Sequence, residues 1–188
     1  MQDEEYQAQQ IPEYGGHAQP ALVERMAPEL RMTLVGTLCA ALAVVTSVVA
    51  LVVFPDFGGA TRGPDWAVVA IVVSLVMMVV TFVQLMAWRR AMAVWRGERS
   101  DDLAGATRVS WFAHLLSYLV VLVGLWACIA GSIAAGTSTA AATLLGFALL
   151  FLLLAQILAG VQYLRTVGPS GTIPGHLRRL STAIQRRR

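Results

Sequence analysis

The sequence predicts an all-α integral membrane protein with four transmembrane helices in an antiparallel bundle. Three observations favour this fold: four apolar stretches contain no charged side chain, arginine is concentrated on one side of them, and their connectors are short. The stretches are Met32–Phe54, Trp66–Trp88, Trp111–Ala135 and Ala141–Leu164. At about 1.5 Å per helical residue each covers about 35 Å, slightly more than the ~30 Å hydrocarbon core of a bilayer.

The segment 1–31 is predicted to be cytoplasmic and mostly disordered. It is rich in Gln, Pro and Gly and too polar for a packed core. Ala21–Arg31 is expected to form a short interfacial helix, which Pro28 kinks or restarts. The acidic residues of this segment, Glu29 among them, make it unlike the basic start of a secretory signal, so the first span is expected to remain in the protein.

The segment 32–164 is the predicted transmembrane domain. Stretches of this length without strand-like alternation satisfy their backbone hydrogen bonds in lipid as helices rather than as barrel strands. The connector Pro55–Asp65 is rich in Gly and Pro and too short for a folded unit. Gly136–Ala140 is shorter still, so the last two helices are expected to be antiparallel neighbours.

Arginine placement predicts the orientation, because basic residues in short loops stay on the cytoplasmic side. The basic side chains of this chain are all arginine, and only Arg62 lies on the side opposite to the others. The others are Arg25, Arg31, Arg89, Arg90, Arg96, Arg99, Arg108, Arg165, Arg178, Arg179, Arg186, Arg187 and Arg188. Both termini are therefore expected in the cytoplasm. Trp66, Trp88 and Trp111 stand at span ends, where aromatic belts form.

The middle connector, Arg89–Ser110, is the longest loop between spans. Its first half is able to extend the second helix beyond the bilayer. Met92, Trp95 and Arg99 would then share one face, which is expected to lie along the membrane surface; a docking surface is the alternative.

The segment 165–188 is predicted to be a basic cytoplasmic tail that ends in an amphipathic helix. Leu177, Leu180 and Ile184 recur at steps of three and four residues, and arginines fill the positions between them. Arg178, Arg179, Arg186, Arg187 and Arg188 are expected to contact anionic lipid headgroups. The tail has no interleaved aromatic residues and no recognisable binding module, so nucleic acid is not an expected partner.

Small residues recur in register along the first and third spans and are expected to be seams of close helix packing. The clearest are Gly36, Ala40, Ala43, Ser47, Gly124 and Gly131. The simplest use of these seams is to hold the four helices of one chain together. The alternative is a surface for a homo-oligomer.

A polar group is expected in the cytoplasmic half of the membrane domain. His114 is the one ionisable side chain within a predicted span, with Tyr118 one turn deeper and Gln84 and Gln156 at comparable depths on other spans. We expect Gln84, His114, Tyr118 and Gln156 to form a hydrogen-bonded structural cluster. A site that handles protons or a ligand is the alternative, because titratable groups inside membranes are costly.

The sequence predicts no catalytic, cofactor-binding or metal site. The predicted spans contain no Asp or Glu, and the three histidines lie in separate regions without ligand spacing. The expected protein is not an enzyme but a non-catalytic accessory, scaffold or regulatory subunit that acts through its cytoplasmic segments on a membrane or cytoplasmic protein partner. A small oligomeric transporter or channel is the alternative. Ala, Gly and Arg have GC-rich codons, so their abundance indicates a GC-rich bacterial genome, and the expected location is the plasma membrane.

Overall fold

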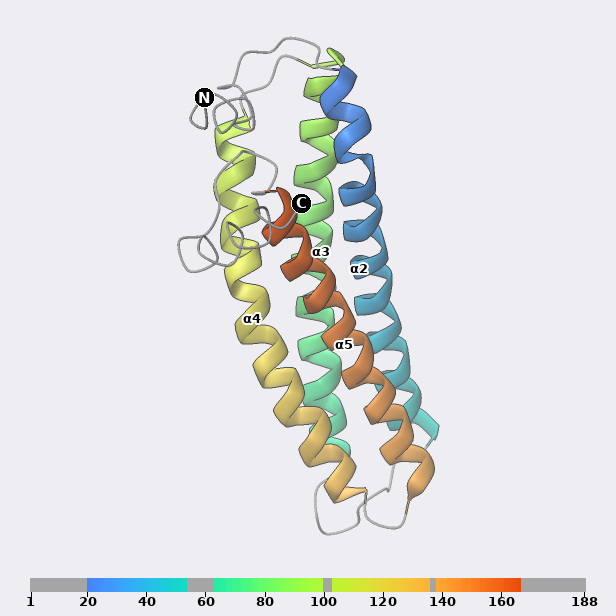
Figure 1. The fold of residues 1–188 in the computed structure, drawn as a ribbon. Helices are drawn as coiled ribbons and strands as arrows, with labels where there is room; N and C mark the ends of the chain where they lie inside the picture. Colours follow the sequence, from blue (N-terminus) through green and yellow to red (C-terminus); the bar gives the residue numbers. More distant parts are fainter. Residues whose placement is uncertain (1–19, 54–62, 100–102, 136–137, 167–188) are drawn as a thin grey trace.

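The computed structural model describes residues 20–53, 63–99, 103–135 and 138–166, and these form four long helices packed side by side (Figure 1). The helices are α2 (Pro20–Val53), α3 (Gly63–Trp95), α4 (Leu103–Ala134) and α5 (Thr139–Thr166). The described residues contain no strand. Residues 1–19 of the predicted N-terminal segment and residues 167–188 of the predicted tail, with the arginines expected to contact lipid, lie outside this part of the chain.

All four helices are long and apolar enough to cross a membrane, as expected for a multi-pass membrane protein. The candidate spans are Met26–Val53, Asp65–Trp95, Phe112–Ala134 and Thr139–Gln162. Large apolar side chains cover their outer surfaces, Leu38, Phe112 and Ile133 among them. Exposed residues of this kind suit contact with lipid tails, which are as apolar as leucine.

Each helix has a buried seam whose residues alternate steps of three and four, the period of left-handed helix packing. The buried seam of α2 contains Met26, Glu29, Thr33, Gly36, Ala40, Ala43, Ser47 and Ala50. The seam of α3 contains Ala67, Ala70, Ser74, Met77, Thr81, Gln84, Trp88, Ala91 and Trp95. The seam of α4 contains Ala113, Ser117, Val120, Gly124, Ala127, Gly131 and Ala134, and that of α5 contains Ala141, Leu145, Ala148, Leu152, Ala155, Ala159 and Gln162. The small residues proposed as packing seams therefore face the interior of a single chain.

The register between neighbouring helices is visible at the buried glycines. A methyl group added to Gly131 of α4 would lie 2.7 Å from Leu145 Cδ1 of α5 and 3.3 Å from Trp66 Cβ of α3. Seven residues earlier, a methyl group on Gly124 would lie 2.8 Å from Leu152 Cδ1 and 3.0 Å from Val73 Cγ1. These neighbouring side chains can lie this close to the α4 backbone because glycine has no Cβ, and small residues are common at helix contacts within membranes.

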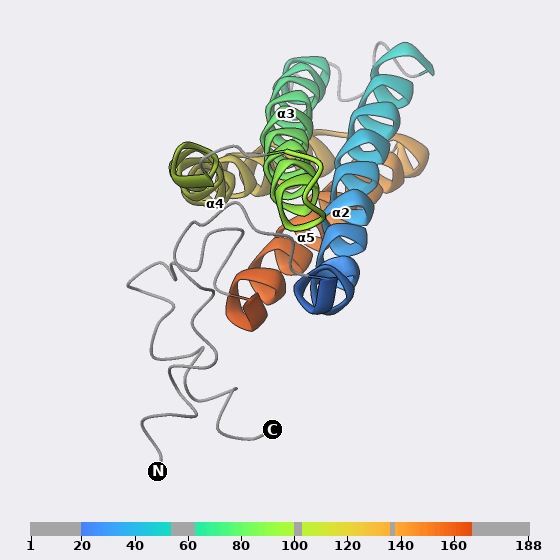
Figure 2. The ribbon, with the colours of Figure 1, turned by 90° about the horizontal axis from the view of Figure 1, so that it is seen from above.

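The helices do not contact one another equally. Helix α3 packs extensively against α2 and α4, and α5 packs against α2 more than against α4. Figure 2 shows the first turns of α4 standing apart from the last turns of α5. We call this end of the molecule, which carries Arg31, Arg89 and Arg96, the arginine-rich end, and the other the opposite end.

The first helix does not restart at Pro28, which was one of the two outcomes expected there, and Ala21–Arg31 is part of one long helix rather than a separate short one. Helix α2 is continuous from Pro20, and Pro28 lies inside it on an exposed side. Proline removes one backbone hydrogen bond but leaves the others in place. Met26 and Glu29 are buried on the inner side, and the packing of this turn against other helices holds it helical.

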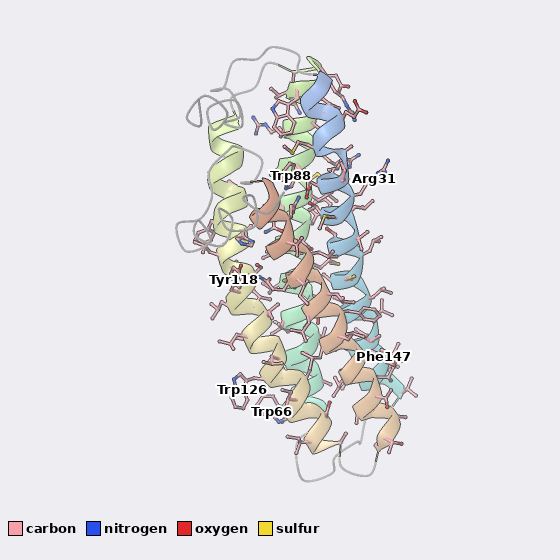
Figure 3. The ribbon with its side chains drawn as sticks, in the orientation of Figure 1. Arg31, Trp66, Trp88, Tyr118, Trp126 and Phe147 are labelled. Atoms are coloured by element: carbon pink, nitrogen blue, oxygen red, sulfur yellow. The ribbon has the colours of Figure 1, made fainter. Side chains whose placement is uncertain are left out.

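The arginine-rich end contains a second apolar cluster, between the start of α2 and the end of α3. Its buried members are Met26, Trp88, Ala91, Met92, Val94 and Trp95, and the rings of Trp88 and Trp95 meet edge to face at 6.4 Å. Two expectations are wrong here. Trp88 is fully buried rather than in a lipid-facing belt, and Met92 and Trp95 pack on α2 rather than along the membrane. Figure 3 shows Trp88 at this end, with Trp66 and Trp126 near the opposite end.

Helix α3 ends at a glycine cap. Gly97 has φ 77°, its N–H donates to Val94 O at 2.9 Å, and the N–H of Glu98 donates to Ala93 O at 3.0 Å. These two bonds form a Schellman motif, which needs a left-handed residue at the position of Gly97. The turn carries an exposed ion pair between Arg96 and Glu98 at 3.8 Å.

Candidate functional site

Three of the four residues assigned to the intramembrane polar cluster are buried. His114 is 0% exposed, Gln84 1% and Gln156 9%, whereas Tyr118 is 38% exposed. They come from three helices: Gln84 from α3, His114 and Tyr118 from α4, and Gln156 from α5. The structure therefore places polar side chains from three helices inside the molecule.

The positions of these residues along the bundle follow from counting helical residues from Gly124, Leu152 and Val73, which lie together in one layer. Gln156 follows Leu152 by four residues, so it lies one turn, about 6 Å, nearer the arginine-rich end on nearly the same side of α5. Ser117 precedes Gly124 by seven residues and lies about 10 Å nearer that end. Gln84 follows Val73 by eleven residues, about 16 Å, and is therefore level with His114. We call Gln84, His114, Ser117, Thr81 and Gln156 the polar belt.

Local hydrogen bonds tie part of the polar belt to its own helices. Ser117 Oγ donates to the carbonyl oxygen of His114 at 2.6 Å, and Thr81 Oγ1 donates to that of Met77 at 3.0 Å. Tyr118 Oη lies 3.3 Å from His114 Nε2, with the two rings edge to face at 5.0 Å. These bonds hold the His114 ring and the two hydroxyls without linking one helix to another.

The two glutamines of the belt are different. Gln84 Nε2 and both amide atoms of Gln156 are inaccessible to solvent and have no hydrogen-bond partner among the described residues. The structure thus brings the predicted residues to one region but shows no bond that joins Gln84 or Gln156 to His114. The hydrogen-bonded cluster remains a prediction.

A neighbouring polar contact was missed from the sequence. Gln162 of α5 donates from Nε2 to the carbonyl oxygen of Glu29 at 3.0 Å and to Thr33 Oγ1 at 2.7 Å. Thr33 Oγ1 in turn donates to the same Glu29 carbonyl oxygen at 3.0 Å. Glu29 is 3% exposed and Gln162 1% exposed. This contact joins α2 to α5 at the arginine-rich end through hydrogen bonds.

Glu29 also corrects the expectation that no carboxylic acid lies in a span, because the first candidate span begins at Met26. The signal was present in the sequence. The small-residue seam of Gly36, Ala40 and Ala43 continues toward the N-terminus, at the same steps of three and four, through Thr33 and Glu29. An acidic residue on that seam is buried when the helix extends far enough to pack.

Other chemistry is sparse in the described part of the chain. It contains no group of three or more His, Cys, Asp or Glu side chains that could hold a metal ion. Cys39 and Cys128 are free thiols on α2 and α4.

Comparison of the chain with protein-family models, with curated proteins and with solved structures found no match.

Proposed function

We propose that this chain is a non-catalytic accessory, scaffold or regulatory subunit of a bacterial plasma membrane. In this proposal the four helices form an antiparallel bundle with both termini in the cytoplasm, as the arginine distribution favours. The protein acts through the arginine-rich end. Its partner is a membrane or cytoplasmic protein, and anionic lipid headgroups contact the tail arginines.

The observation that carries the proposal is the apolar cluster at the arginine-rich end. Helix α3 has 33 residues, about 50 Å at 1.5 Å each, so its end extends beyond a ~30 Å hydrocarbon core. Trp88 and Trp95 pack this extension against Met26 of α2. A projecting helix end that buries two tryptophans has an ordered backbone, and it therefore carries its charged residues at defined points along the helix.

The charge on this projection defines what it can bind. Arg31, Arg89 and Arg96 are exposed around the cluster. Guanidinium groups form paired hydrogen bonds with carboxylates and phosphates. An acidic protein segment is the partner that this chemistry favours beyond the lipid headgroups.

The test is purification from the native membrane in mild detergent, followed by intact mass determination of the complex. The variant Arg89→Gln/Arg96→Gln removes two charges of the projection, and Arg62→Gln is the control from the opposite side. A second sample lacks residues 167–188. We expect a stoichiometric protein partner with the wild type and Arg62→Gln, and its loss from one or both of the other samples. A pure homo-oligomer that is identical in all four samples would contradict the proposal.

A small oligomeric transporter or channel is the second candidate, favoured by the buried side chains of Gln84, His114 and Gln156. Polar groups inside membranes commonly mark ion or substrate paths. This candidate predicts solute flux into vesicles that is abolished by Gln84→Leu or His114→Leu. The tight packing at Gly124 opposes a path through one chain at this point, so a path would need a second conformation or an interface between copies.

A further inference from the structure

The polar belt contains more hydrogen-bonding capacity than the described helices use. Gln84 Nε2 and both amide atoms of Gln156 are buried without a partner. An amide that leaves water without gaining a compensating hydrogen bond is unfavourable in free energy. The bundle therefore carries an unfavourable term that a bound hydrogen-bonding molecule would remove.

Glutamine differs here from the other buried polar residues. Serine and threonine hydroxyls can bond to a carbonyl oxygen one turn back in their own helix, as Thr81 and Ser117 do. The buried hydroxyls of Ser47 and Ser74 have the same option after a rotation about χ1. In a helix whose backbone is fully bonded, Gln84 and Gln156 have no such local partner, so their amides require a group from elsewhere.

The belt has one closed side. Toward the opposite end, the layer of Val73, Gly124 and Leu152 is tightly packed: an added methyl group at Gly124 would lie 2.8 Å from Leu152 Cδ1 and 3.0 Å from Val73 Cγ1 and would fit only if one of these side chains shifted. Beyond it the buried seams of α3 and α4 continue mainly in alanines, such as Ala70 and Ala127. Helix α4 packs less extensively against α5 than α2 does. A molecule would therefore reach the belt from the arginine-rich end.

The side chains of the belt indicate the chemistry of the occupant. A carboxamide both donates and accepts, and the hydroxyl oxygens of Thr81 and Ser117 keep lone pairs that can accept. The belt contains no carboxylate and no guanidinium, and the neutral imidazole of His114 adds a hydrogen-bond donor and an acceptor but no charge, so a bound ion finds no permanent opposite charge there. A charged occupant would lose its hydration without compensation.

We propose that the polar belt is a binding site for a small uncharged molecule that both donates and accepts hydrogen bonds, and that it opens only toward the arginine-rich end. Water and a small amide-like solute share this chemistry. The amide groups of Gln84 and Gln156 hold the occupant from α3 and α5. The proposal does not depend on the accessory role, which is tested by co-purification rather than by access to the bundle interior.

The first experiment compares thiol reactivity at two depths of α4, in protein lacking Cys39 and Cys128 (Cys→Ala) and held in lipid nanodiscs. Ser117→Cys places a thiol in the belt, and Ala127→Cys places one on the same seam beyond the Gly124 layer. Both positions are buried, at 0% and 1% exposed. Methanethiosulfonates need an ionised thiol and hence water, so we expect uncharged methyl methanethiosulfonate to modify Ser117→Cys and not Ala127→Cys.

The charge of the probe tests the class of occupant. Cationic and anionic methanethiosulfonates of similar reactivity should leave Ser117→Cys unmodified, because the belt has no countercharge. The variant Gln156→Leu in the Ser117→Cys background should slow modification by the uncharged probe by roughly tenfold, through loss of a hydrogen-bonding partner of the occupant. Excess acetamide that slows the reaction would identify an amide-like solute as the occupant, and no effect of acetamide would identify water.

A second pair of cysteine variants, on α3, keeps the test valid if the α4 variants do not fold. Thr81→Cys lies in the belt, and Ala70→Cys lies on the same seam beyond the closed layer. Thermal unfolding and gel filtration check that each variant folds. The proposal is overturned if neither belt thiol is modified, if the thiols beyond the Gly124 layer react as fast as those in the belt, or if the charged probes react as well as the uncharged one.

Discussion

Single glycines set how closely the helices of this bundle approach one another. Gly131 and Gly124 lie where an added methyl group would come within 3.0 Å of a neighbouring side chain, whereas nothing lies within 4 Å of the corresponding position at Gly146. At Gly36 the nearest atom is the Ala155 carbonyl oxygen at 3.8 Å, an ordinary contact. The glycines of this bundle therefore differ in how much each contributes to close packing between helices.

Gly131→Ala should destabilise the bundle, because the methyl group would meet both Leu145 and the inflexible Cβ of Trp66. Overpacking of this kind costs about 1–3 kcal/mol. Gly146→Ala is the matched control and should be neutral or stabilising by up to about 1 kcal/mol, because alanine favours a helix more than glycine does. Thermal unfolding in detergent measures both. Equal shifts for the two variants would show that the crossing at Gly131 is looser than the structure has it.

The hydrogen bonds from Gln162 to Glu29 and Thr33 should be measurable as a coupling between α2 and α5. In a double-mutant cycle, Gln162→Leu and Thr33→Val should interact by about 0.6 kcal/mol, the average for hydrogen bonds between membrane helices. Thr37→Val is the control, since Thr37 Oγ1 bonds only to Thr33 O within its own helix. Additive effects for the Gln162 and Thr33 pair would mean that this bond does not link the helices in the membrane.

The sequence identified part of the polar set at this scale. His114, Gln84 and Gln156 stand out because polar residues are rare in apolar stretches, and the structure has all three buried. Glu29 and Gln162 did not stand out in the same way. Glu29 was assigned to an acidic, solvated leader, because its burial depends on how far α2 extends and on α5, which is more than a hundred residues away in the chain.

Two helix ends differ in whether the local sequence or the packing between helices determines them. The end of α3 is local: Gly97 adopts φ 77°, a conformation that other residues rarely take. The start of α2 is not local, because Pro28 argues against a helix that packing against other helices nevertheless maintains. Packing also decides the position of Trp95. The sequence predicts this residue on the membrane surface, whereas the structure has it buried in the cluster with Met26 of α2.

Replacing Gly97 tests the helix end of α3. Gly97→Ala should weaken the cap by about 1–2 kcal/mol, since a Cβ is disfavoured in the left-handed region, and Gly97→Asn should cost less, since asparagine tolerates that region. Hydrogen exchange of the backbone amides at Arg96 and Glu98 should accelerate in the order glycine, asparagine, alanine. The same exchange rate in all three proteins would contradict a left-handed cap.

The whole molecule is organised by charge along its length. The topology proposed from the arginine distribution predicts that Arg62→Cys reacts with a membrane-impermeant thiol reagent in intact cells. Ser181→Cys, at the other end of the charge asymmetry, should react only after the cells are opened. Both variants are made in protein lacking Cys39 and Cys128. Reaction of Ser181→Cys in intact cells would reverse the proposed orientation.

The sequence by itself determined the number of membrane helices, their approximate bounds and the seams of small residues along α2 and α4. These follow from hydropathy and from steps of three and four residues, which are local properties of the chain. The tertiary structure alone decided which polar side chains are buried together. Whether Glu29 faces Gln162, whether Trp88 faces lipid or Met26, and whether Gln156 finds a partner depend on the register between helices, and register is set by contacts such as those at Gly124 and Gly131 that join residues far apart in sequence.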